Sequence, residues 1–447
     1  MPARKKGLKR FLSGVELEFF LLDREGNVSN CADSVLKKAK GLNPKASIEQ
    51  ECAKNMIELN HYPKEHPQDT IRELLETYEV LLDAANDLGI LTLPLSCYPG
   101  TFEPQMRTGK LYGVKRKIFG AKKFKIAGRV TGFHYHHTLP RGVFDKERLV
   151  IKRLVNSKFK AATINAYNFA IAADPALSVL MASSPFYQSE HLGKDSRVFV
   201  YRGGRKLKYP QGLYSDFLSI GGLPPYKQTL EDLKYSMRRR RLIWKGEIRR
   251  AGGNPNLVDS YASPLDIGWN PVRINKHDTI EQRGIDMNFL DNVMGTTTLM
   301  NYAMDRIQDE FILVAPSEIG IDEPFKLEGK VLYIPPHTYL RNRLQYQAAL
   351  HGFASKSAKR YSKRFVRFCR SCMPSRQMDI AGPAIKIADA ERSVSDSILR
   401  FARRRGHDVM KTKARLPQPL AREIALHAAG QGTRRMRKTE RILEKYL

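Results

Sequence analysis

The chain has 447 residues and a formal net charge of +30, because 76 Lys and Arg stand against 46 Asp and Glu. Hydrophobic residues make up 42% of it and only five cysteines occur, which excludes a disordered chain and a disulfide framework. No apolar run approaches the ~18 residues of a membrane helix, and no apolar segment follows the basic N-terminus, so we expect a cytoplasmic protein without membrane contact. The basic excess suits polyanions and small acidic substrates equally.

Two long helices are predicted in the first half of the chain. Between residues 70 and 88 the apolar residues recur on one helical face, and Gly89 follows as a stop signal. A second helical pattern is predicted from about residue 145 to 172. The other segments are short, alternate in polarity like strands and end in Gly or Pro turns, so the order of elements predicts an α+β fold.

The C-terminal part of the chain is strongly basic. Residues 351–447 carry 24 Lys and Arg but 8 Asp and Glu, and their apolar spacing is helical in places. We therefore predict a main body, residues 1–350, and a basic, mostly helical extension, residues 351–447, that is available for polyanion contact. Cys369 and Cys372 are interpreted as two reduced thiols on a helix, with redox or metal use as the alternative.

Two glutamates share one face of the first predicted strand. In Gly14-Val-Glu-Leu-Glu-Phe-Phe, an extended backbone places Glu16 and Glu18 on one side, about 7 Å apart, and apolar residues on the other. Two such acids repel each other unless cations neutralise them, which indicates a metal site. A sheet face that is simply exposed to solvent is the alternative.

A second strand-like segment, Met56-Ile-Glu-Leu-Asn60, carries Glu58 on the face opposite Ile57. Glu51 lies seven residues before Glu58, an odd offset that excludes the same face of one straight strand. It can join Glu58 only after a bend or from a preceding helix, and a solvated surface glutamate is the alternative.

A third segment, Thr131-Gly-Phe-His-Tyr-His, places His134 and His136 on one strand face. Imidazoles bind metals or donate to phosphate oxygens. Histidines satisfied within a polar strand are the alternative.

In a fourth segment, Thr279-Ile-Glu-Gln-Arg, Glu281 and Arg283 share a strand face, and Arg273 lies a few residues upstream. Such residues hold a metal ion and a transferring phosphoryl group, whose transition state spreads negative charge over three oxygens. A structural ion pair is the alternative.

Together the four segments supply the carboxylates, histidines and arginines that a nucleotide site with several metal ions requires. A zinc site, with three protein ligands and one open position, remains an alternative. The abundance of glutamate favours a hard cation such as Mg²⁺.

The order of these motifs resembles that of the glutamate–cysteine ligase type 2 family, carboxylate–amine ligases of the glutamine synthetase superfamily. The four segments and Ala182-Ser-Ser-Pro-Phe186 follow one another in unbroken order over roughly residues 10–310. The chain departs from the family at Trp269-Asn-Pro-Val-Arg273, where members often have Trp-Tyr-Asp-x-Arg, and at His137-Thr138. These departures bear on the amine substrate and the ATP pocket rather than on the metal ligands.

The resemblance implies a glutamine-synthetase-like catalytic domain, in which a curved antiparallel sheet flanked by helices holds ATP and divalent ions on its concave face. It implies that Mg²⁺, with Mn²⁺ as a substitute, is bound by Glu16, Glu18, Glu51, Glu58 and Glu281. It further implies that His134 or His136 contacts metal or phosphate, that Arg283 and Arg273 act on the phosphoryl group, and that Arg197 contacts ATP or substrate.

The function implied is ATP-dependent amide formation through an acyl phosphate, with glutamate as the carboxylate and cysteine as the amine, as in glutathione biosynthesis. A ligase that uses ammonia or another amine is the second hypothesis. The third is a nucleic-acid-binding protein on an inactive ligase scaffold, which the charge favours and the set of acids opposes. A homo-oligomer is compatible with the sequence.

Overall fold

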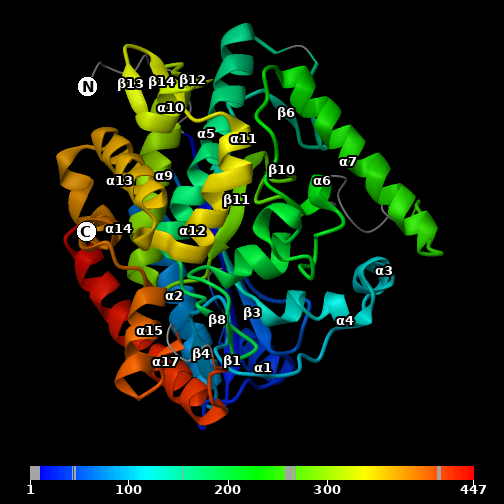
Figure 1. Cartoon of the computed structure of the whole chain (residues 1–447), viewed down its shortest axis with the longest axis vertical. Coiled ribbons are helices and arrows are strands. Elements are labelled where there is room, and N and C mark those ends of the chain that lie inside the picture. Colours follow the sequence, from blue (N-terminus) through cyan, green and yellow to red (C-terminus); the bar gives the residue numbers. More distant parts are fainter. Residues whose placement is uncertain are drawn as a thin grey trace.

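The computed structural model describes residues 11–42, 44, 47–153, 155–256, 265, 268–409 and 414–446. A central antiparallel sheet is covered by long helices, and the C-terminal helices lie along one side of the molecule (Figure 1). Within the described residues, no helix combines the length and apolarity needed to cross a bilayer. The basic N-terminal residues, on which the prediction of no signal segment partly rests, lie outside the described part.

The central sheet has the strand order β10-β11-β5-β1-β3-β2, and β4 also pairs with β1. All these neighbours are antiparallel. Its strands are β1 (Ser13–Leu22), β2 (Ser47–Gln50), β3 (Met56–Asn60), β4 (Leu91–Leu93), β5 (Gly132–Thr138), β10 (Val272–Asn275) and β11 (Thr279–Asp286). Smaller sheets join β12 (Leu313–Pro316), β13 (Lys326–Glu328) and β14 (Val331–Ile334), β6 (Phe144–Asp145) with β7 (Val150–Ile151), and β8 (Phe186–Tyr187) with β9 (Glu190–His191).

The helices differ widely in length. The long ones are α2 (Pro67–Asn86), α5 (Ser157–Met181), α7 (Leu230–Arg250), α9 (Leu290–Asp309), α13 (Lys356–Ser371), α14 (Met378–Ala390), α15 (Val394–Arg404) and α17 (Gln418–Glu444). The others are α1 (Ala32–Gly41), α3 (Lys110–Phe119), α4 (Ala121–Phe124), α6 (Leu218–Gly221), α10 (Ile319–Asp322), α11 (His337–Tyr339) and α12 (Gln345–His351). The mixture confirms the predicted α+β class, with its antiparallel sheet and its helical C-terminal region.

The first strand shows why the sheet has two different faces. Val15, Leu17 and Phe19 are buried in the main core together with apolar residues of α2, α5 and α9. This period of two follows directly from the pleat of an extended strand. On the other face, Phe20 belongs to a second core, and Glu18 lies nearer the start of the strand. One strand therefore anchors the fold and presents acids.

The helix predicted from residue 145 begins later in the structure. Residues 144–151 form the hairpin of β6 and β7, and α5 starts at Ser157, where the Asn156 side chain accepts the N–H of Lys158 at the N-cap. The helix also continues past residue 172 and through Pro175. In the turn before that proline, the Tyr361 hydroxyl donates to the Ala172 carbonyl at 2.7 Å. Tertiary packing thus overrides the local stop signal.

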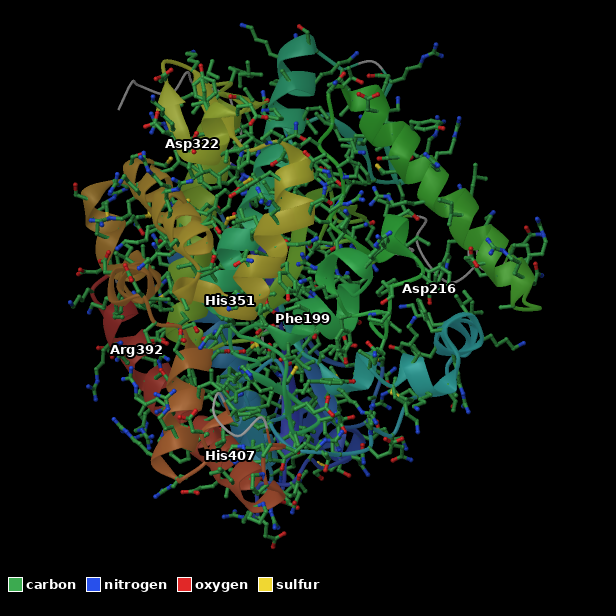
Figure 2. All side chains as sticks on the ribbon, in the orientation of Figure 1. Phe199, Asp216, Asp322, His351, Arg392 and His407 are labelled. Carbon is green, nitrogen blue, oxygen red and sulfur yellow. The ribbon has the colours of Figure 1, made fainter. Side chains whose placement is uncertain are left out.

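The C-terminal helices share the main core. The rings of three α13 residues pack against Phe169 of α5 or against Phe325, in stacked, tilted or edge-on arrangements: Tyr361, Phe365 and Phe368. Helix α17 packs on α9, α2 and β4. Nitrogen-tipped side chains project from the surface of these helices, around the labelled Arg392 and His407, and from α7 (Figure 2). The helical character agrees with the prediction for this region, and the division at residue 350 stays a prediction.

Candidate active site

The strand register brings most of the predicted side chains to one face of the sheet. Residues that oppose each other in antiparallel strands project to the same side. The opposed pairs are Glu16–His134 and Glu18–Glu58 around β1, and Glu281–His136 and Glu281–Arg273 around β11. Side-chain alternation predicted which residues share a face within each strand. The pairing of the strands then places these residues next to one another in one site.

Glu16 lies between the two histidines. Its Oε2 is 2.8 Å from His134 Nδ1, and its Oε1 is 3.2 Å from His136 Nε2. Burial alone would raise the pKa of the Glu16 carboxyl, but both imidazoles together hold that pKa well below its usual range. His136 is fixed in turn by Thr279, whose hydroxyl oxygen is 3.0 Å from His136 Nδ1. Glu16 is therefore an ionised carboxylate in a rigid setting.

A second acidic group consists of Glu18, Glu51 and Glu58. Glu51 lies in the turn between β2 and β3, which is the bend that the odd offset from Glu58 required. Burial, together with the charge of Glu51, raises the pKa of Glu18 to about 8, and burial with the neighbouring glutamates raises the pKa of Glu58 well above its usual value. The raised pKa values show that the ionised carboxylates would repel one another in this buried setting. A cation bound between them would remove that repulsion.

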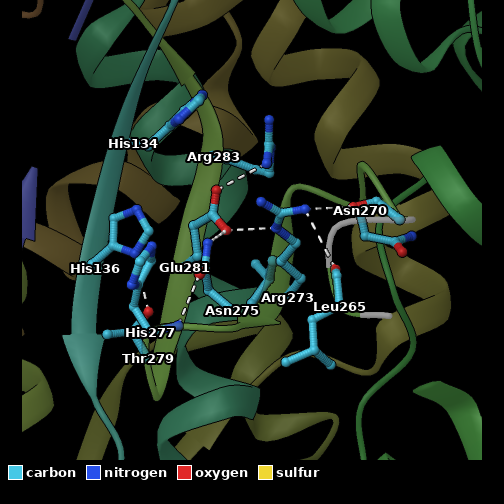
Figure 3. A network of polar contacts seen from close by, with 12 residues as sticks. His134, His136, Leu265, Asn270, Arg273, Asn275, His277, Thr279, Glu281 and Arg283 are labelled. Carbon is cyan, nitrogen blue, oxygen red and sulfur yellow. Dashed lines mark hydrogen bonds and ion pairs between the residues drawn. The ribbon is translucent and has the colours of Figure 1, made fainter. Parts of the chain in front are cut away.

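Glu281 is the centre of a polar network on β10 and β11 (Figure 3). Arg283 donates to Glu281 Oε1 at 2.9 Å, while Arg273 and the Asn275 amide donate to Oε2. Burial opposes ionisation of this carboxyl, but Arg273 and Arg283 lower its pKa far below the usual value. Since Arg273 also donates to the Gly268 carbonyl at 3.1 Å, it braces the network from the edge of the sheet.

Arg197 approaches the site from the segment that precedes residues 198–202. Its guanidinium donates to the carbonyls of Arg283 and Ile285, both at 3.1 Å, and lies 5.3 Å from the centre of the Trp269 ring. Its charge lowers the pKa of Glu18, against the effect of burial. All ten predicted site residues thus belong to one connected region, with Arg197 at its margin.

The acids fit a divalent cation. Three groups have ligand atoms within 4.8 Å of one another: Glu16, Glu58 and His134; Glu16, His136 and Glu281; and Glu18, Glu51 and Glu58. Among the described residues, no Lys or Arg forms an ion pair with Glu16, Glu18, Glu51 or Glu58, because both paired arginines of the network serve Glu281. Partly buried carboxylates without a Lys or Arg partner match the oxygen ligands that hard cations prefer.

The sequence patterns did not assign a role to two residues at the site. Burial lowers the pKa of the Lys115 ammonium on α3. Arg283 lowers this pKa further and Glu51 raises it, so Lys115 lies near both residues of the site. Trp269 lies under Arg197 and Arg283. Neither belongs to a strand that carries the acids, so no alternation could have revealed them.

The Ala-Ser-Ser-Pro-Phe motif supports the site from behind. Ser183 and Ser184 donate through a backbone N–H, at 3.0 Å, and a hydroxyl, at 2.6 Å, to Asp286 at the end of β11. These bonds fix the strand that carries Glu281 and Arg283. The motif therefore contributes position rather than a reacting group.

Comparison with known proteins gives the fold a context. A model of glutamate-cysteine ligase family 2 matches residues 12–210. The resemblance to that family is therefore confirmed over this part of the chain. The structure also aligns with glutamate–cysteine ligase from Francisella tularensis in complex with AMP, at 14% identity over 99% of this chain and 94% of that one, with a TM-score of 0.59.

A second alignment is with a bifunctional glutathione synthetase from Pasteurella multocida, at 16% identity and a TM-score of 0.54. It covers 96% of this chain and 52% of that one, so this chain spans about half of the bifunctional protein. No curated protein matches the sequence. The family match supports an ATP-dependent carboxylate–amine ligase, and the two alignments show a shared fold. Glu281 and Arg283 lie beyond the matched residues, so their roles rest on the geometry.

Proposed function

We propose that this protein joins the side-chain carboxylate of glutamate to the amine of cysteine at the expense of ATP. One observation carries the proposal: among the described residues, one sheet face gathers four glutamates without Lys or Arg ion-pair partners next to two arginines, in a chain whose N-terminal part matches glutamate–cysteine ligase family 2. A face of this kind serves a polyphosphate that arrives with its own cations. A binder of bare polyanions has no use for it.

Divalent cations, Mg²⁺ or Mn²⁺, fit the three acidic groups. We assign Glu16, Glu18, Glu51, Glu58 and Glu281 as their ligands, with His134 or His136 in contact with metal or phosphate. Such ions, when bound, neutralise the ATP oxygens and polarise the γ-phosphoryl group. The histidines keep Glu16 ionised and oriented, so the carboxylate is ready to bind without a prior change in protonation.

The reaction has two steps. A carboxylate oxygen of glutamate bonds to the γ-phosphorus of ATP, the bond to the bridging oxygen breaks, and ADP leaves. The cysteine nitrogen then bonds to the activated carbonyl carbon and loses a proton to solvent, and phosphate leaves with the former carboxylate oxygen and the pair of electrons. The sheet holds both reactants in place, which is where most of the acceleration of such reactions originates.

Two arginines have donors available for this chemistry. The Nε atoms of Arg283 and Arg197 are buried and have no hydrogen-bond partner, although other nitrogens of both guanidinium groups are engaged. We assign Arg283 to the oxygens of the transferred phosphoryl group and Arg197 to ATP or a substrate carboxylate. Arg273 braces Glu281 and so keeps Arg283 and its acid partner aligned.

The test is phosphate release from ATP by the purified chain with Mg²⁺ or Mn²⁺, glutamate and a panel of amines, with the product identified by mass spectrometry. The proposal predicts release that requires glutamate and is fastest with cysteine. Release that is fastest with ammonia or another amine would support the ligase activity but contradict the assignment of cysteine as the amine substrate. No glutamate-dependent release with any amine, together with tight nucleic-acid binding, would contradict the proposal in favour of an inactive scaffold.

A further inference from the structure

A second concave feature lies apart from the acidic face. A cavity of about 710 Å³ opens between α7, α6 and the helical turn at residues 340–344. In Figure 1, α6 and α7 lie on the same side of the molecule. Arg202, which lines the cavity, forms a paired ion contact with Asp174 of α5, and Asp174 also accepts the Gln282 side chain. Since Gln282 alternates with Glu281 and Arg283 on β11, this pair lies on the opposite face of the strand from the candidate site.

The lining of the cavity is cationic. Besides Arg202 it contains Lys206, Lys227, Arg239, Arg240 and Arg341. Within the described part of the chain, none of these five forms an ion pair with an Asp or Glu. The acid of the lining, Asp232, is engaged in the capping box of α7, where it accepts the N–H of Thr229 at 3.0 Å. Cations gathered in this way repel one another and leave a positive potential that attracts an anion.

The lining contains a buried lysine and a buried hydroxyl without a hydrogen-bond partner. Lys227 is only 8% exposed, and burial together with Arg240 lowers the pKa of its ammonium to about 8. The Tyr226 hydroxyl next to it is buried and forms no hydrogen bond. A buried hydroxyl without a hydrogen-bond partner is unfavourable, and a ligand oxygen can supply that partner. The backbone of Lys227 pairs with the Asn168 side chain in both directions at 2.8 Å, so the lysine is held in place independently of its ammonium.

Part of the remaining wall is apolar and aromatic. Leu218, Leu223 and Pro224 line the cavity, and the Tyr226 ring packs edge-on against His337 with ring centres 5.7 Å apart. The volume lies in the range of small-molecule sites, about 300–1,000 Å³. Several donors in front of an apolar wall suit a molecule with a phosphate at one end and an organic body at the other.

We propose that this cavity binds a small organic phosphate, with Lys227, Arg239 and Arg341 on the phosphate oxygens and the apolar wall against the organic part. This site is distinct from the ligase centre, and it stands whether or not the proposed ligase reaction is correct. Because Arg202 connects the lining to Asp174, the ligand lies next to residues that contact the back of β11.

The test is calorimetric titration of the full chain with ribose 5-phosphate and with inorganic phosphate, without ATP or divalent cation. We expect saturable binding of ribose 5-phosphate, tighter than that of inorganic phosphate. Lys227→Gln and Arg341→Gln should each weaken it at least about tenfold, or ~1.4 kcal/mol. If the Lys227 variant does not fold, Arg239→Gln replaces it, because Arg239 is exposed on α7.

Arg238→Gln is the matched control, since Arg238 is an exposed neighbour on α7 outside the cavity lining, and its affinity should equal that of the unmodified chain. Glu58→Gln should also leave the affinity unchanged. Binding that survives both Lys227→Gln and Arg341→Gln, or that Glu58→Gln abolishes, would overturn the proposal by placing the anion elsewhere. Equal affinity for inorganic phosphate and ribose 5-phosphate would contradict the proposal that the apolar wall binds the organic part of the ligand.

Discussion

The two faces of β11 carry charges in opposite arrangements. On one face, Arg202 and Asp174 form a two-pronged pair at 2.6 and 2.7 Å, and both side chains are 2% exposed. On the other face, Glu281 has two arginines, while the glutamates of the neighbouring strands have none. The charges of Arg202 and Asp174 balance each other, whereas the glutamates on the second face outnumber the basic groups that pair with them.

This difference separates a structural ion pair from a binding site. A balanced buried pair needs nothing from outside, and removing one partner leaves an uncompensated charge. A buried cluster with excess acid is costly by itself and becomes favourable only when a cation joins it. Substitutions on the first face should therefore lower stability, and substitutions on the second should lower turnover while the fold persists.

Arg202→Met should have the largest effect on stability. It leaves Asp174 buried and unpaired, so the free energy of unfolding should fall by about 3–5 kcal/mol. Chemical denaturation measures this loss. The double variant Arg202→Met with Asp174→Leu should recover part of it, and no recovery would show that the charge pair is not the cause.

Glu58→Gln should have the opposite profile. The amide keeps the shape of the side chain but removes one acid from the crowded group, so the melting temperature should stay level or rise. Turnover should fall by about 10²–10³-fold, because a proposed cation ligand is lost. Added Mg²⁺ or Mn²⁺ should raise the melting temperature of the unmodified chain more than that of the variant. Normal turnover in a folded variant would remove Glu58 from the site.

Arg283→Lys tests the boundary between the two arrangements, because Arg283 both pairs with Glu281 and offers a free Nε. Lysine keeps the charge but lacks the planar fork of donors. If Arg283 acts mainly in the transition state, turnover should fall by about 10²-fold and ATP affinity far less. Turnover that falls only in step with the folded fraction would assign Arg283 to structure alone.

Arg435→Gln should have the smallest effect of the set and tests how the C-terminal helices contribute. Arg435 of α17 pairs with the fully buried Asp291 of α9 at 2.8 Å, and Lys438 contacts the same carboxylate at 3.3 Å. Because Lys438 remains, the loss of stability should be about 1–2 kcal/mol. Arg437→Gln, an exposed neighbour, should change it by less than ~0.5 kcal/mol.

Arg435→Gln also tests a proposal about the whole region. We propose that the extension, residues 351–447, stabilises the body and supplies no reacting group. Turnover per folded molecule should therefore be unchanged in the Arg435 variant, and a large loss at constant stability would contradict this division of labour.

Local pattern predicted much of the site, and long-range pairing supplied the rest. The faces of Glu16, Glu18 and Glu58 followed from the pleat, because side-chain alternation is a local property. The register that sets Glu16 opposite His134 depends on strands far apart in sequence, which no spacing encodes. Glu51 reaches the site because it lies in the turn between β2 and β3, and the sequence did not predict that turn.

The errors have physical causes as well. The start of α5 was misplaced because residues 144–151 pair with each other as a hairpin, and its end was misplaced because buried packing carries the helix through Pro175. The Asp174–Arg202 pair was not predicted, since its partners come from a helix and a distant segment. The sharing of one core by α5 and α13 is likewise a tertiary property.

The central claim is that the acidic face supports acyl-phosphate formation. The most direct test uses glutamate labelled with ¹⁸O in its side-chain carboxylate, together with ATP, a divalent cation and cysteine, and follows the label by mass spectrometry. The account predicts one ¹⁸O atom in each phosphate released and ADP as the nucleotide product. Label in AMP, or phosphate free of label, would contradict it.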